Sequence, residues 1–119
     1  MNPCKIQTID EFIQQLNCAP VDFNKTMQLI DYYYNFTPKN FTNGKVMNQK
    51  NSNNGSCKIL SFGLLNGLSK QATLHAFGDF YANDVLKNPE NSDHQNIRNF
   101  MQFGWEGVHF ETVALTLKR

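Results

Sequence analysis

The 119-residue sequence carries little charge of either sign. It contains 11 Lys and Arg and 10 Asp and Glu, for a formal net charge of +1, and only 18% of its residues are charged. Globular proteins usually have about a quarter. The charges form no basic block, so the chain lacks the electrostatic footprint of a protein that binds nucleic acid or an anionic membrane. We therefore expect neither nucleic acid nor a membrane as a partner.

Long apolar runs and paired cysteines are also missing. The longest mostly apolar stretch, residues 59–68, is interrupted by polar residues and is too short to span a bilayer. The first residues, MNPCKIQTIDEF, contain no apolar core of a signal peptide, which favours a cytoplasmic location. Cys4, Cys18 and Cys57 are odd in number and form no CxxC pair, so we interpret them as reduced thiols.

Amides and aromatic residues are abundant instead. Sixteen Asn and eight Gln outnumber the charged residues, and ten Phe, four Tyr and one Trp supply large side chains to bury. A length of 119 residues is close to the commonest size of one domain. We therefore expect residues 1–119 to form a single domain around one core.

Two helices are expected in the first third of the chain. Thr8 and Glu11 have the spacing of a capping box, and a short amphipathic helix follows them up to about Asn17. Asp22 starts a second helix with apolar residues at helical spacing. The aromatic run at residues 32–36 ends that helix just before a proline.

A central helix is expected over residues 56–66. Asn53 or Asn54 caps it, and its apolar residues point in nearly every direction around the helical wheel. That distribution is typical of a buried helix rather than a surface one. Gly67 ends the helix, and Ser69 caps the next one.

The last helix follows a second capping box, with Ser92 as N-cap and Gln95 at the third helical position, and it ends at Gly104. Its apolar stripe includes Asp93 and Asn96, with two further polar residues at its edge, His94 and Arg98. Gln95, Asn99 and Gln102 fall on the opposite, solvated side. A buried polar group without a hydrogen bond costs about 1–3 kcal/mol, so the polar residues on the stripe either fasten loops to the helix or line a pocket.

Two segments outside the helices favour strand. The segment from Thr37 to Val46 contains the turn signal Asn43-Gly44, and the segment from Val108 to Leu117 is rich in alternating and β-branched residues. We expect them to pair as an antiparallel ribbon. The sequence thus predicts an α+β fold, a mostly helical single domain of five or six short helices with a small β ribbon.

Cys57 is a candidate nucleophile. It lies in the first turn of the expected central helix, where unpaired N–H groups and the helix dipole lower a thiol pKa. His94, with Asp93 or Asn96, lies at the start of another helix, so a Cys/His/Asx catalytic arrangement is conceivable. The alternative is a buried structural thiol.

The loop before Cys57 resembles an anion cradle. Asn53-Asn54-Gly55-Ser56 places small residues before a helix N-terminus, and Lys58 adds a positive charge. The spacing is not that of a nucleotide P-loop, and the simpler interpretation is an N-cap with a tight turn.

Metal binding has little support, because the three histidines lack the spacing of metal ligands and no Cys pair accompanies them. We expect no metal and no cofactor.

Several segments together resemble the HopJ type III effector family. They are NGSCKI from Asn54, FGD from Phe77 and DHQNIRNFMQFGW from Asp93, and the similarity extends from about Ile9 to Thr116. The family is named for a protein linked to the type III secretion system of plant-pathogenic bacteria. The resemblance therefore implies a bacterial, effector-like protein with a route of secretion, without implying a particular reaction.

Three functions are compatible with these features. The first is binding of a small ligand in a polar pocket formed by the NNGSCK and DHQNIR segments, with candidate binding residues Asn43, Asn54, Lys58, Asn96 and Arg98. The second is a non-enzymatic effector or protein-interaction domain in which these residues are structural and the contact patch is Trp105 or the tyrosine run at residues 32–34. The third is a thiol-dependent hydrolase that uses Cys57 and His94, with Asp93 as a further candidate.

Overall fold

Helices make up most of the chain. The computed structural model describes residues 6–118. In that part of the chain the α-helices are α1 (Ile9–Cys18), α2 (Phe23–Tyr33), α3 (Asn54–Asn66), α4 (Lys70–His75) and α5 (Gln95–Phe103). A π-helical turn, η1 (Phe80–Val85), and a 3-10 turn, η2 (Gly104–Gly107), lie before and after α5.

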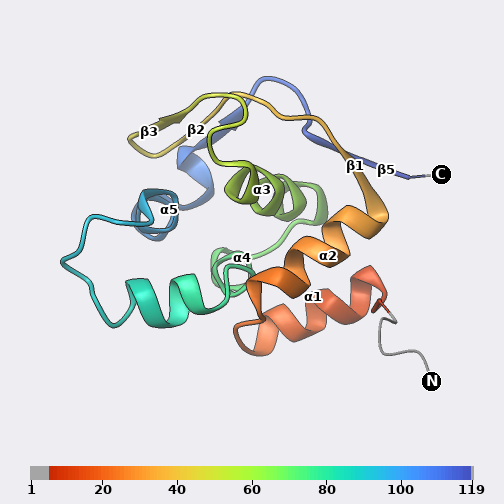
Figure 1. The fold of residues 1–119 in the computed structure, drawn as a ribbon, viewed down its shortest axis with the longest axis horizontal. Coiled ribbons are helices and arrows are strands. Elements are labelled where there is room, and N and C mark those ends of the chain that lie inside the picture. Colours follow the sequence, from red (N-terminus) through yellow and green to blue (C-terminus); the bar gives the residue numbers. More distant parts are fainter. Residues whose placement is uncertain (1–5, 119) are drawn as a thin grey trace.

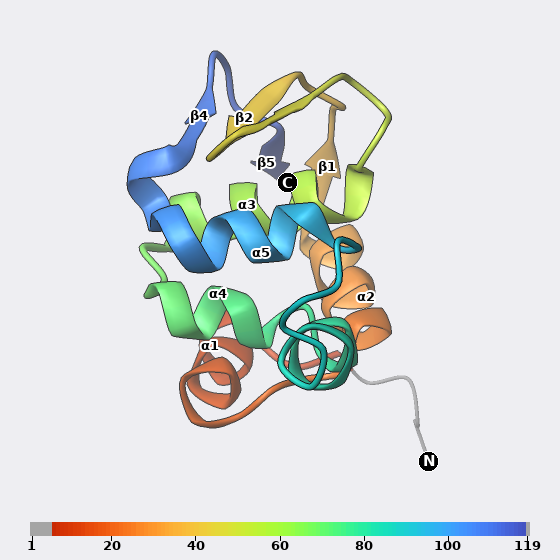
Figure 2. The same cartoon turned by 90° about the vertical axis from the view of Figure 1, so that its left-hand side faces the viewer.

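Five short strands lie together at one end of the molecule (Figures 1 and 2). They are β1 (Tyr34–Phe36), β2 (Phe41–Asn43), β3 (Val46–Asn48), β4 (Val108–Phe110) and β5 (Leu115–Leu117). One antiparallel sheet has the order β3-β2-β4, and the other pairs β1 with β5. The predicted α+β fold with several short helices and small antiparallel sheets is confirmed.

The predicted antiparallel pairing of the two segments is confirmed, but the predicted length of the paired strands is wrong. Within the two predicted segments β2 pairs with β4, but residues 108–117 do not form one strand. The chain turns after β4, and β5 pairs with β1, a segment predicted to end a helix. Thr37 precedes a proline and so disfavours helix, and its backbone N–H donates to the Ala114 carbonyl at 2.8 Å. Aromatic residues also suit a strand, so the chain leaves α2 in extended form from Tyr34 onward.

Local capping signals are mostly confirmed. The Thr8 hydroxyl accepts from the Glu11 backbone N–H at 3.1 Å, and the Glu11 carboxylate accepts from the Thr8 N–H at 3.0 Å. Ser69 caps α4, and Gly67 ends α3 in the left-handed conformation with φ of 62°. These contacts span at most four residues, so the sequence alone determines them.

The capping box predicted for α5 is wrong. The helix begins at Gln95, and His94, with φ of 51°, is its N-cap. The Gln95 side chain donates to the Ser92 carbonyl at 2.7 Å, and Arg98 Nε donates to the Asp93 carbonyl at 2.6 Å. Both bonds hold residues 92–93 outside the helix, so Asp93 is exposed rather than part of the apolar stripe.

The core forms around α3, which lies between the strands and α4, with α5 alongside it (Figures 1 and 2). Ile59, Leu60 and Phe62 have no exposed surface, and the Phe62 ring meets other aromatic rings edge-on. The predicted all-round burial fails for Leu64 and Leu65, which are about half exposed.

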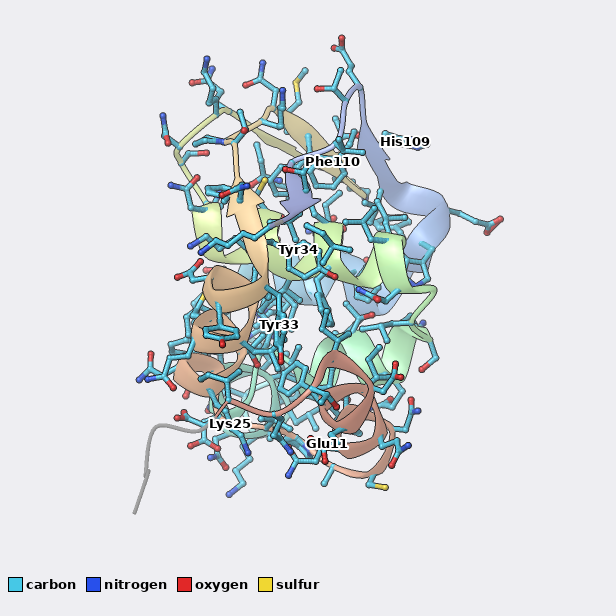
Figure 3. The ribbon with its side chains drawn as sticks, turned by 90° about the vertical axis from the view of Figure 1, so that its right-hand side faces the viewer. Glu11, Lys25, Tyr33, Tyr34, His109 and Phe110 are labelled. Atoms are coloured by element: carbon cyan, nitrogen blue, oxygen red, sulfur yellow. The ribbon has the colours of Figure 1, made fainter. Side chains whose placement is uncertain are left out.

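The residues predicted as an aromatic contact patch, Trp105 or the tyrosine run, are partly covered in the structure. Trp105 Nε1 donates to the Leu68 carbonyl at 2.8 Å and is half-buried. Tyr34 is buried where α2 passes into β1, and the Tyr33 hydroxyl donates to the Gln7 carbonyl at 2.8 Å (Figure 3). Of these aromatic residues, Tyr32 is the exposed one.

Candidate functional site

The side chains of Asn43, Asn48 and Asn96 form a hydrogen-bonded cluster between the three-stranded sheet and α5. Asn43 Nδ2 donates to the carbonyl and the side-chain oxygen of Asn96 at 2.7 and 3.0 Å. Asn48 and Asn96 exchange two side-chain hydrogen bonds of 2.9 Å. All three residues are buried. These hydrogen bonds fasten β2 and β3 to α5, while Asn43 Oδ1 is buried without a hydrogen-bond partner among the described residues.

Asn99, for which the sequence predicts a solvated side chain, attaches the turn between β2 and β3 to α5. It is buried, and its Oδ1 accepts from the Lys45 backbone N–H at 2.8 Å. The turn between β2 and β3, with Gly44 at φ of 60°, lies against it. A wheel drawn for an isolated helix does not reveal a turn that comes from more than fifty residues away, so sequence reasoning missed both Asn48 and Asn99.

His94 is held in an unusual conformation. A positive φ is uncommon for a residue other than glycine and marks a local constraint. His94 Nε2 lies 3.0 Å from Asp84 Oδ2 and 3.9 Å from Asp93 Oδ2. Its ring lies over Phe80, with the ring centres 5.2 Å apart. Asp84 and Phe80 both belong to η1, so this π-helical turn positions the histidine.

His94 lines a cleft of about 380 Å³ that brings the NNGSCK and DHQNIR segments together. Small-ligand sites usually have volumes of this order. Side chains and backbone from α2, β3, the start of α3, η1 and the start of α5 line it: Phe23, Val46, Asn53, Gly55, Ser56, Phe77, Phe80, His94, Gln95, Asn96 and Ile97.

The start of α3 offers unpaired donors to this cleft. Asn53 is the N-cap, but its side chain makes no capping bond and donates instead to Asn48 Oδ1 at 2.6 Å. The first intrahelical bond runs from the Cys57 N–H to the Asn53 carbonyl, so the N–H groups of residues 54–56 come before it. A Cβ on Gly55 would lie 2.9 Å from the Phe23 ring, so only glycine allows this ring to pack against the helix start.

Cys57 lies outside the cleft lining, and the predicted lowering of its thiol pKa is wrong. The residue is 1% exposed, and burial raises the pKa of the thiol. A backbone hydrogen bond from Lys39 and the charge of Lys58 lower it by less than burial raises it. Desolvation therefore outweighs the helix N-terminus. Among residues 6–118, no hydrogen bond joins Cys57 to His94.

The remaining predicted site residues make local contacts outside the cleft lining. Lys58 Nζ pairs with Asp31 Oδ1 at 2.8 Å, and Arg98 Nη2 pairs with Asp93 Oδ1 at 2.7 Å. The hydrogen bond from Arg98 lowers the pKa of the Asp93 carboxyl. Asn54 Nδ2 donates to Asn51 Oδ1 at 3.4 Å. The structure therefore does not gather all the predicted residues in one pocket.

Neither a metal-binding cluster nor a membrane-spanning helix is present among residues 6–118. In that range no three His, Cys, Asp or Glu side chains are arranged to hold a metal ion. No helix in that range is both long and apolar enough to cross a membrane.

Comparison with known proteins gives the family. The family model of the HopJ type III effector protein matches residues 9–115 of the sequence. The chain belongs to this family. No curated protein matches it. The crystal structure of a protein of unknown function, VPA0580, is similar over 99% of this chain and 100% of its own, with 53% sequence identity and a TM-score of 0.91. Membership of the HopJ family supports an effector-like function and specifies no reaction.

Proposed function

We propose that this HopJ-family protein is an effector-like domain that binds a small ligand in the cleft between the start of α3 and the start of α5. The observation that carries the proposal is the convergence of the NNGSCK and DHQNIR segments on a cleft of about 380 Å³. His94 lines this cleft in a left-handed backbone conformation.

The cleft has an apolar and a polar wall. Phe23, Phe77 and Phe80 supply aromatic surface, while His94 and the first-turn N–H groups of α3 supply polar atoms. Small-molecule sites commonly combine a mostly apolar lining with a few polar groups that orient the ligand. The ligand is accordingly a small molecule with an aromatic or apolar part and at least one polar group.

The backbone at His94 supports a functional role for this position. A non-glycine residue in the left-handed region costs about 1–2 kcal/mol, and such strain persists where surrounding contacts enforce it. Here the Asp84 carboxylate and the Phe80 ring supply those contacts. Strained residues of this kind concentrate at binding and catalytic sites.

Binding is favoured over thiol catalysis. Cys57 is buried outside the cleft lining, and a raised thiol pKa keeps its sulfur protonated and weakly nucleophilic. In our proposal Asn43 and Asn96 act structurally, as the interaction-domain alternative requires, since their side chains bond to each other. The ligand-binding role rests on His94 and the start of α3.

We also propose that residues 1–119 act as one domain in a cytoplasmic compartment, with type III secretion as the route that the family name suggests. Cys18 and Cys57 are free thiols, as expected in a reducing environment. Cys4 lies outside the described residues. The buried residues from all five α-helices form one core.

The test is a titration of ¹⁵N-labelled protein with benzyl alcohol, benzoate and benzylamine, followed by amide chemical shifts. We expect saturable shifts confined to Gly55, Ser56, His94 and Gln95 with at least one probe. Val46→Phe fills the cleft from β3 and should abolish them, whereas Met47→Phe, at an 82% exposed neighbour, should not. Scattered shifts, none at all, or shifts that survive Val46→Phe contradict the proposal.

A further inference from the structure

Asp84 lies against one nitrogen of the His94 ring, and the other nitrogen of this cleft-lining residue has no hydrogen-bond partner among residues 6–118. We infer that Asp84 is a positioning residue that fixes the proton of His94 on Nε2, so that Nδ1 is a hydrogen-bond acceptor and the cleft selects ligands with an O–H or N–H group. The ligand class rests on the proposed function, whereas the role of Asp84 does not.

The proton on Nε2 follows from the chemistry of its neighbours. Nε2 is 3.0 Å from Asp84 Oδ2, and the next carboxylate oxygen, on Asp93, is 3.9 Å away. An ionised carboxylate only accepts hydrogen bonds, so the nitrogen facing it must donate. In the neutral ring the proton therefore resides on Nε2, and Nδ1 carries a free lone pair.

Nδ1 has no partner within the described part of the chain. No side chain or backbone group of residues 6–118 hydrogen-bonds to it, and His94, whose side chain is 29% exposed, is one of the residues that line the cleft. The Phe80 ring packs on the imidazole at 5.2 Å and, with Asp84, restricts its rotation. The free lone pair is thus held in one orientation.

This lone pair complements the other polar groups of the cleft. The N–H groups at the start of α3 donate hydrogen bonds, so they attract acceptor atoms on a ligand. Nδ1 of the neutral ring accepts and attracts an O–H or N–H. An ether or ester oxygen at the same place would face a lone pair and gain no hydrogen bond. The class of ligand is therefore a small alcohol, phenol, amine or amide with an apolar part.

Asp84 and Asp79 provide a matched pair for the experiment. Asp84→Lys places a donor opposite Nε2, which then has to accept, so the proton moves to Nδ1. Asp79→Lys makes the same charge change beside the same turn, at a residue whose carboxylate bonds to Asn83 and not to His94. Asp84 is 47% exposed, so the fold can accommodate the longer side chain. Asp84→Ala is a second variant that removes the acceptor alone.

The tautomer is read from the imidazole ¹⁵N shifts of the free protein, at a pH above the titration of the ring. We expect the Nε2–H form in the wild type and Asp79→Lys, the Nδ1–H form in Asp84→Lys, and a mixture in Asp84→Ala. An Nδ1–H tautomer in the wild type, or an unchanged tautomer in both Asp84 variants, overturns the role of Asp84. This measurement needs no ligand.

The ligand class is tested with benzyl alcohol and benzyl methyl ether. The wild type and Asp79→Lys should bind the alcohol roughly fivefold more tightly, which is the effect of about one neutral hydrogen bond, and Asp84→Lys should lose this preference. Equal binding of the two compounds to the wild type overturns the ligand class. If benzoate shifts the cleft amides but benzyl alcohol and benzylamine do not, the ligand class fails and the proposed function stands. If no probe shifts them, both fail, while the tautomer still decides the role of Asp84.

Discussion

Cys57 shows how the surroundings of one side chain determine its chemistry. Its position at the start of a helix favours a thiolate, but its burial favours the neutral thiol, and burial has the larger effect on its pKa. Asn96 and Asn99 make the same point for amides. Three residues apart, they are neighbours on the surface of α5, and both are buried because β2, β3 and the turn between them lie against that part of the helix.

Cys18 and Cys57, the two cysteines within the described residues, should therefore react at very different rates. At pH 8 we expect iodoacetamide to alkylate the exposed Cys18 quickly and Cys57 only after unfolding. Peptide mass spectrometry over a time course separates the two sites. Alkylation of Cys57 in the native protein as fast as that of Cys18 would show that its thiol is neither protected nor neutral.

The same raised pKa has a consequence for stability. Unfolded Cys57 ionises near its ordinary value of 9.0, while the folded thiol keeps its proton. The unfolded state therefore binds fewer protons above that pH, and the contribution of Cys57 to the free energy of unfolding falls as the pH rises. Urea unfolding between pH 8 and 10 should show a smaller decrease for Cys57→Ala than for the wild type.

The connections between elements carry their own constraints. Gly78, between α4 and η1, has φ of 62°, and a Cβ there would lie 2.5 Å from the Val21 carbonyl oxygen and 2.8 Å from the Phe23 nitrogen. The backbone entering α2 thus passes directly over this glycine. Val21 N–H also donates to the His75 carbonyl at 3.0 Å. This close approach positions Phe23, one wall of the cleft.

Gly78→Ala and Gly67→Ala should separate conformational strain from steric overlap. Both glycines have φ of 62°, but nothing lies within 4 Å of a Cβ at Gly67. We expect Gly67→Ala to cost about 1–2 kcal/mol from the left-handed backbone alone. Gly78→Ala should cost about 1–3 kcal/mol more, because the loop before α2 must move. Equal losses in urea unfolding would mean that the loop moves without a penalty.

At the scale of the whole molecule, the β1–β5 pair joins the first third of the chain to its last residues. Phe36 pairs with Leu115 and Tyr34 with Leu117, and the Lys118 N–H continues the ladder to the Tyr33 carbonyl at 2.9 Å. Leu115 is 1% exposed and belongs to the core, whereas Leu117, two residues on, is 62% exposed. β5 therefore contributes to the core mainly through one side chain.

Truncation of these two leucines should differ accordingly. Leu115→Ala removes a buried side chain and should lower the free energy of unfolding by about 2–5 kcal/mol. Leu117→Ala, in the same strand, should change it by only about 0.5 kcal/mol. Chemical denaturation monitored by tryptophan fluorescence measures both. Similar effects of the two substitutions would indicate that β5 does not pack on the core as described.

Several features were predictable because they depend on neighbouring residues alone. The capping box of α1, the Ser69 cap and the glycine stop of α3 each involve atoms a few residues apart, so their chemistry is complete within one segment. The family resemblance likewise follows from the residues themselves and is confirmed by the match over residues 9–115.

Which polar residues meet was not predictable from the local pattern, because it depends on contacts between distant segments. His94 became the N-cap of α5 and faces Asp84, Asn99 lies beneath the turn between β2 and β3, and residues 108–117 divide between two sheets. Each outcome depends on hydrogen bonds or packing between segments that the local pattern does not connect. The pattern along one helix or strand specifies which faces are apolar, but burial and the partner of each polar group depend on what the rest of the chain places against that face.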